Sequence, residues 1–176
     1  MAFGDSGVDS DAQRQLAGRM SAETFDFGPH TGDLAYGGAA GAGAGSTPAL
    51  QAAFFDVYRD WMRRRPLYPS IGNHDEEAEH AQPYRSAFVL PESSATSAHP
   101  DHAERYYSFD CGPLHVVGLD TELAFQNPLR RQAQLPWLMA DLAATRQVWK
   151  VAVFHRSPYG AGGVGNVNYL SFEPVP

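Results

Sequence analysis

Apolar side chains recur in four short runs of this chain, and each run is followed by a residue that can bind a metal ion. The runs are residues 2–3, 25–27, 67–71 and 151–154, and segments with helical periodicity lie between them. Apolar strands that alternate with helices are typical of an α/β fold with a largely parallel sheet. Because ligands of such sheets bind beyond the carboxyl ends of the strands, the four following segments should meet in one crevice.

Helices are expected in three places. One begins at Thr47, the expected cap, with Pro48 in its first turn and apolar residues at helical spacing behind it. Two more are predicted over residues 9–20 and 134–146. Residues 106–119 are expected to form two strands joined by a tight turn.

The residues that follow the four runs form a mixed set of oxygen and nitrogen donors. They are Gly4-Asp5, Gly32-Asp33, Gly72-Asn73 and His155. A glycine before the donor lets the backbone turn sharply and approach the site closely. Carboxylate, amide and imidazole ligands suit Mn, Fe or Zn, and the absence of thiolate excludes an iron–sulfur cluster. This pattern predicts metal-assisted hydrolysis of a phosphoester, in which two ions clamp the attacking and leaving oxygens.

Composition excludes several other classes of function. The 13 basic and 20 acidic residues give a formal charge of −7, which argues against a nucleic-acid partner because phosphate backbones need clustered Lys and Arg. No apolar run reaches the roughly 18–20 residues that would span a membrane. The 176 residues fit one domain. The N-terminus shows no signal-peptide pattern, and both the compartment and the oligomeric state are left open.

Four motifs, in order, resemble those of the calcineurin-like metallophosphoesterases. They are Gly4-Asp5-Ser6-Gly7, Gly32-Asp33-Leu34-Ala35-Tyr36, Gly72-Asn73-His74-Asp75 and His155-Arg156-Ser157-Pro158-Tyr159. The tyrosine after the second aspartate and the His-x-x-Pro-Tyr ending resemble the purple acid phosphatase branch in particular. The resemblance covers residues 3–159 and implies an α/β metallophosphatase-type sandwich, with β-sheets flanked by helices.

The resemblance also implies a pair of metal ions, drawn from Fe, Zn and Mn, and a ligand set for them. Asp5 would bind the first ion and Asp33 would bridge both ions. Tyr36 would be a phenolate ligand of a ferric first ion, with simple packing as an equal alternative. Asn73 and His155 would bind the second ion.

His74 is the catalytic residue that the resemblance implies. It would lie beside the substrate phosphate and either stabilise it or protonate the leaving group. The implied nucleophile is a hydroxide held by the ions, since coordination lowers the pKa of water toward about 7. The implied substrate is a small phosphoester, either a monoester or a diester.

One departure from the family concerns the histidines at the end of the site. The family adds a Gly-His-x-His motif that gives one histidine to each ion, and no histidine follows His155 here. We therefore expect residues 1–176 to form a single metallophosphoesterase-like catalytic domain that is truncated at the C-terminus, and leave open a shortened N-terminus. Two alternatives remain: a non-catalytic remnant that binds metal weakly, and a structural α/β domain whose Gly-Asp turns hold no metal.

The other titratable residues are expected to serve the fold or the surface. His30 should pack or support a ligand, and His115 should pack between strands. Asp120 should either support the site or cap a turn. Solvent-exposed loops are expected to carry the remaining histidines and an acidic cluster: Glu76, Glu77, Glu79, His80, His99 and His102.

Overall fold

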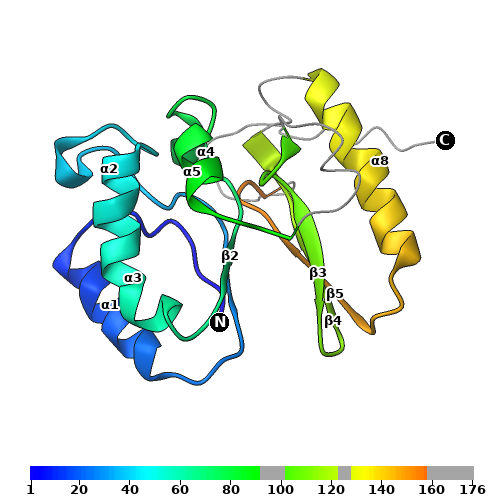
Figure 1. The fold of residues 1–176 in the computed structure, drawn as a ribbon, viewed down its shortest axis with the longest axis horizontal. Helices are drawn as coiled ribbons and strands as arrows, with labels where there is room; N and C mark the ends of the chain where they lie inside the picture. The colour runs from blue at the N-terminus through cyan, green and yellow to red at the C-terminus, as the bar shows by residue number, and fades with distance from the viewer. Residues whose placement is uncertain (92–101, 123–127, 158–176) are drawn as a thin grey trace.

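The protein is an α/β structure whose strands lie between two groups of helices (Figure 1). The computed structural model describes residues 1–91, 102–122 and 128–157. The first part of the chain contains α1 (Asp11–Ala22), β1 (Gly28–His30), a 3₁₀ turn (Ala39–Gly41), α2 (Thr47–Leu50), a π-helical turn (Gln51–Phe55), α3 (Asp56–Met62), β2 (Leu67–Pro69), α4 (Asn73–Glu76) and α5 (Gln82–Ala87). The second part contains β3 (Tyr107–Cys111), β4 (Leu114–Gly118), α8 (Pro128–Ala144) and β5 (Trp149–Val153).

The first sheet is short and parallel. β1 pairs with β2, and Phe3 forms a single parallel bridge to His30, the last residue of β1. The expected strand at residues 2–3 is therefore reduced to one bridge. Residues 25–27 were expected in a strand but precede β1, because Phe25 packs edge-on against Trp61 and Phe27 against Phe109 instead of pairing in the sheet.

The helices beside this sheet bury the larger core. α1 begins after Ser10, whose hydroxyl accepts a hydrogen bond from the Gln13 N–H, which confirms a helix in this region. α2, the π-helical turn and α3 run on continuously as one helical segment. Phe54, Tyr58 and Trp61 from this segment are fully buried, and burying such aromatic side chains contributes strongly to stability.

The cap of this second helix differs by one residue from the prediction. Ser46 has the extended backbone of a cap (φ −68°, ψ 156°), and Thr47 is already the first helical residue. The expectation that Thr47 is the cap is therefore wrong. Pro48 lies in the first turn as predicted, where its missing N–H costs no hydrogen bond.

The second sheet is mixed. β3 and β4 are antiparallel and joined by a tight turn in which Gly112 has φ 56°, which confirms the predicted pair of strands. β5 pairs in parallel with β4, so only part of the sheet structure is parallel. Helix α8 begins at Pro128 rather than Gln134, and its Trp137 packs on Tyr106.

In the part of the chain that the structure describes, no helix is long and apolar enough to cross a membrane.

Candidate metal centre

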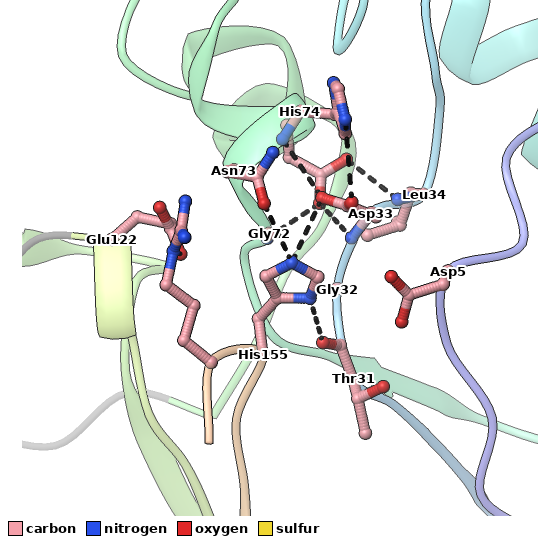
Figure 2. A network of polar contacts seen from close by, with 12 residues as sticks. Asp5, Thr31, Gly32, Asp33, Leu34, Gly72, Asn73, His74, Glu122 and His155 are labelled. Atoms are coloured by element: carbon pink, nitrogen blue, oxygen red, sulfur yellow. Dashed lines mark hydrogen bonds and ion pairs between the residues drawn. The ribbon is translucent and has the colours of Figure 1, made fainter. Parts of the chain in front are cut away.

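The segments that follow Phe3, β1, β2 and β5 meet at one edge of the strands (Figure 2). Asp33 follows β1, Asn73 follows β2, and His155 follows β5. Asp5 follows the bridge at Phe3, and its carboxylate points toward the cluster. The predicted convergence of the strand ends is therefore present in the structure.

Three of the predicted ligands offer donor atoms to one small volume. One donor atom from each of Asp5, Asp33 and His155 lies within 4.8 Å of the others. The His155 Nε2 atom is 3.5 Å from Asp33 Oδ1 and 3.1 Å from Asn73 Oδ1. Asp33 is buried whereas Asp5 is exposed, so the cluster opens to solvent on the Asp5 side.

In the neutral tautomer of His155, the lone pair of Nε2 faces the Oδ1 atoms of Asp33 and Asn73. Its Nδ1 atom lies 2.9 Å from the Thr31 carbonyl oxygen, which can only accept a hydrogen bond. In the neutral ring Nδ1 therefore carries the proton, and Nε2 is an acceptor that faces other acceptors. Electron-rich atoms with no proton between them are the donor set that a cation binds. The residues present thus fit a metal ion.

His74 and Tyr36 border the cluster. The His74 N–H donates to Asp33 Oδ1 at 3.0 Å, and its ring Nε2 lies 4.0 Å from Asp33 Oδ2. The Tyr36 hydroxyl donates to Asp5 Oδ1 at 3.2 Å, and the Tyr36 and His74 rings meet edge-on with centroids 4.7 Å apart. All six residues predicted for the site are thus brought together. Their individual roles as ligands or catalyst remain predictions.

The surroundings of Tyr36 keep it a phenol in the absence of a cation. Burial raises the pKa of Tyr36, and the charges of Asp33 and Asp5 raise this pKa further. A phenolate at this position therefore requires a positive charge nearby to offset the carboxylates.

The backbone at the two aspartates is in an unusual conformation. Asp5 has φ 51° and Asp33 has φ 57°, both in the left-handed region that most side chains avoid. Such conformations persist only where the surrounding structure holds them, and they cluster at functional sites.

Two glycines allow the loops of the site to touch. A Cβ on Gly32 would lie 2.9 Å from His155 Nδ1 and 2.8 Å from the Gly72 nitrogen, and a Cβ on Gly72 would overlap Asp33. The glycines before Asp33 and Asn73 are therefore a steric requirement.

Asp75 belongs to the same cluster, although the sequence pattern assigned it no role. Its carboxylate accepts hydrogen bonds from the N–H groups of Asp33, Leu34 and Gly72, each at 2.9 Å. Burial raises the pKa of Asp75 to about 7, although the three N–H donors lower it. The sequence offered one signal for Asp75. It is the third residue of helix α4, a position from which an acidic side chain accepts a hydrogen bond from the N–H of the capping residue, here Gly72.

His30 lies beneath the cluster, as expected of a packing or supporting residue. It is fully buried, and its Nδ1 atom accepts the Gly32 N–H at 3.1 Å. Nε2 therefore carries the ring proton and donates to Ser6 Oγ at 2.9 Å. Burial, followed by the charge of His155, lowers the pKa of His30 to about 3, so the ring is neutral.

Buried polar contacts correct two expectations of a surface role, those for Glu76 and His102. Glu76, predicted on the surface, is buried, and its Oε2 lies 3.0 Å from Arg105 Nη1. The same Nη1 lies 2.7 Å from the buried carboxylate of Asp120, the residue expected either to support the site or to cap a turn. His102 is also buried, and its Nδ1 lies 3.1 Å from the hydroxyl of Tyr106.

Of the remaining expectations about titratable residues, some are confirmed, one is confirmed in part, and others fall on residues that the structure does not describe. Exposure is confirmed for Glu77, Glu79 and His80. His115 is buried as predicted, but it lies in an ion cluster rather than in apolar packing, with Asp110 and Asp141 each 2.7 Å from its ring nitrogens. His99 and the Pro158-Tyr159 end of the fourth motif lie outside the described residues.

Comparisons with known proteins identify the family of this chain. Residues 1–173 match the family model of the calcineurin-like phosphoesterases. Human acid phosphatase type 7 is 27% identical over 166 residues, which are 89% of this chain and 35% of that protein. Purple acid phosphatase 21 of Arabidopsis thaliana is 27% identical over 144 residues, which are 77% of this chain and 30% of that protein. The chain thus spans about a third of the length of these curated relatives.

A solved structure supports the fold. The structure of a purple acid phosphatase from yellow lupin seeds superposes with a TM-score of 0.67 at 19% identity, over 88% of this chain and 29% of that one. The helices and sheets described above correspond to part of that fold. Together with the family match, this shows that the chain belongs to the calcineurin-like phosphoesterase family and resembles the purple acid phosphatase branch within it.

Proposed function

We propose that this chain carries the metal site of a phosphoester hydrolase that acts on a small phosphomonoester or phosphodiester. The observation that carries the proposal is the cluster of donor atoms from Asp5, Asp33 and His155, all within 4.8 Å of one another. A net charge of −7 favours a small substrate held by cations over a nucleic-acid backbone.

The resemblance to the purple acid phosphatases assigns the donor set to two ions. Asp5 and Tyr36 would hold the first ion, Asn73 and His155 the second, and Asp33 would bridge the two. When bound, the ions would lower the pKa of coordinated water, bind the phosphate oxygens and offset the charge that develops in the reaction. The carboxylates of Asp5 and Asp33 bring two negative charges, which favours cations at this position.

The protein orients each ligand through its own contacts. The Thr31 carbonyl fixes the ring of His155 so that Nε2 faces Asn73 and Asp33. The N–H of His74 holds Asp33 Oδ1. Ligands that are held before the metal arrives need no costly reordering on binding.

His74 is suited to stabilise the phosphate or to donate a proton to the leaving group. Its side chain is 35% exposed at the edge of the cluster, so a substrate can reach it. Its Nδ1 atom lies 2.8 Å from the Glu77 carboxylate, and its Nε2 lies on the side of Asp33. A histidine held beside the reacting group is a common general acid in proteins.

Turnover of p-nitrophenyl phosphate and bis(p-nitrophenyl) phosphate with Mn, Fe or Zn supplied tests the proposal. We expect the wild type to hydrolyse at least one substrate, and Asp33→Asn to lose more than the roughly 10- to 100-fold typical of residues that only support a ligand. The exposed Asp26→Asn is the matched control and should retain wild-type rates. Equal inactivity of the wild type and Asp33→Asn with every metal would refute the enzyme, and metal binding without turnover would favour a weakly metal-binding remnant.

A further inference from the structure

The loops that carry Asp33 and Asn73 hold each other by hydrogen bonds in both directions. The His74 N–H donates to Asp33 Oδ1 at 3.0 Å, and in return the Asp33 N–H donates to Asp75 Oδ2 at 2.9 Å. These partners are 41 and 42 positions apart in the sequence. The bonds therefore fix the distance between the two loops rather than the shape of either loop alone.

Asp75 lies at the centre of this arrangement and is fully buried. Its Oδ2 atom accepts the N–H of Asp33 and that of Gly72, and its Oδ1 accepts the N–H of Leu34. Both oxygens are thus committed to backbone donors from the two loops.

The two N–H groups from the first loop flank one residue. The amides of Asp33 and Leu34 lie on either side of the Asp33 Cα atom, where φ is 57°. Fixing both peptide groups fixes the direction of the Asp33 side chain and holds a conformation that would otherwise relax.

We infer that Asp75 is a positioning residue of the site: it sets the conformation of Asp33 and the spacing of Asp33 from Asn73 without binding metal or substrate itself. Its effect on metal affinity rests on the proposed function, whereas its hold on the two loops does not. An asparagine at position 75 would turn an NH₂ group toward one of the three backbone donors and so lose at least one hydrogen bond.

Amide hydrogen exchange and Mn²⁺ titration of Asp75→Asn test this inference. Glu76→Gln is the matched control, because Glu76 is the next residue on α4, is also buried, and bonds to Arg105 rather than to the loops. We expect exchange of the Asp33 and Leu34 amides to rise at least about 10-fold in Asp75→Asn alone. We expect its Mn²⁺ affinity to fall by about 10- to 100-fold.

Several results would overturn the inference. These are unchanged exchange at Asp33 and Leu34 in Asp75→Asn, wild-type Mn²⁺ affinity in a folded Asp75→Asn, or an equal loss of affinity in Glu76→Gln. Failure of the wild type to bind Mn²⁺ would refute the proposed function, and the exchange data would still decide whether Asp75 holds the loops. If Asp75→Asn does not fold, the wild type alone decides: its Asp33 and Leu34 amides must be as protected as those of Val116 and Val117 in β4, and fast exchange contradicts the inference.

Discussion

The Nε2 atom of His155 lies 3.1 Å from the Oδ1 atom of Asn73, although 82 positions separate the two residues in the chain. The two residues follow strands of different sheets, β5 and β2. A buried hydrogen bond from Ser70 Oγ to the Val153 carbonyl, 3.0 Å long, ties the ends of these strands together. The site therefore depends on how the two sheets meet, and not on either sheet alone.

A pair of glycine substitutions tests the close contact between the loops of the site. Gly72→Ala should lower the free energy of unfolding by about 1–3 kcal/mol, because the new Cβ overlaps Asp33. Gly18→Ala is the control, since Gly18 lies in α1 and a methyl group added there would have nothing within 4 Å. It should raise the free energy of unfolding by about 0.5–1 kcal/mol. Urea denaturation measures both, and a neutral Gly72→Ala would show that the loops do not need this contact.

Tyr36→Phe tests the phenolate predicted for the first ion. A ferric ion bound by a phenolate should give the wild type a visible charge-transfer band, as the purple acid phosphatase resemblance implies. The variant should still bind iron, because it keeps the other ligands. It should lack the band, because it has lost the Tyr36 hydroxyl, which donates to Asp5 in this structure. Absorption spectra after ferric loading measure this, and an identical band in Tyr36→Phe would assign Tyr36 to packing.

The ion cluster around His115 predicts a loss of stability in alkaline solution. Burial alone would lower the pKa of His115, but hydrogen bonds and ion pairs with Asp110 and Asp141 outweigh it and raise this pKa. Among the described residues, Lys150 also carries a charge near His115: it lies opposite His115 on β5, and its Nζ donates to the Gln147 carbonyl. Because the folded pKa is raised, the contribution is fully present below about pH 6.5, the ordinary pKa of histidine, and is lost as the pH rises through the folded value.

Urea denaturation from pH 5.5 to pH 9 measures this effect. His115→Gln should remove the loss of stability over that range, since glutamine does not titrate. The exposed His80→Gln should leave it unchanged. A wild-type stability that rises across the same pH range would contradict a charged His115.

Removing the charge of Arg105 should lower the free energy of unfolding strongly. Burial lowers the pKa of Arg105, but Asp120 and Glu76 outweigh this and raise it, so the ion is firmly charged. Arg105→Met would leave both carboxylates buried without their cation, which costs about 3–5 kcal/mol of unfolding free energy. The exposed Arg64→Met should stay within about 0.5 kcal/mol of the wild type. Equal stability of the two variants would mean that water or protonation satisfies Glu76 and Asp120.

The sequence predicted the convergence of the site because each strand end carries its own local signal. An apolar run that ends in glycine and a donor residue identifies a strand and its exit without reference to the rest of the fold. The exact first and last residues of the strands were harder to predict from the sequence. β1 consists of Gly28, Pro29 and His30, whereas the apolar residues before it, Phe25 and Phe27, pack against rings from distant segments.

The buried ion network of Arg105 and the contacts of Asp75 could not be predicted, because both depend on partners far along the chain. Glu76 and Glu77 are neighbours with the same side-chain chemistry, yet only Glu76 is buried. Its partner Arg105 comes from 29 positions away, and a helix of four residues is too short to show which face is buried. Asp75 was missed for the same reason, since two of its three donors come from the Asp33 loop.

The number of metal ions that bind to the purified chain tests the central claim most directly. Protein prepared without chelator and equilibrated with Mn, Fe or Zn is analysed by inductively coupled plasma mass spectrometry, beside Asp33→Asn and Asp26→Asn. We expect about two ions per chain in the wild type and in Asp26→Asn, and a clear loss in Asp33→Asn, which removes the bridging carboxylate charge. Less than one ion per chain in the wild type with every metal, or equal binding by Asp33→Asn, would contradict a metal centre at these strand ends.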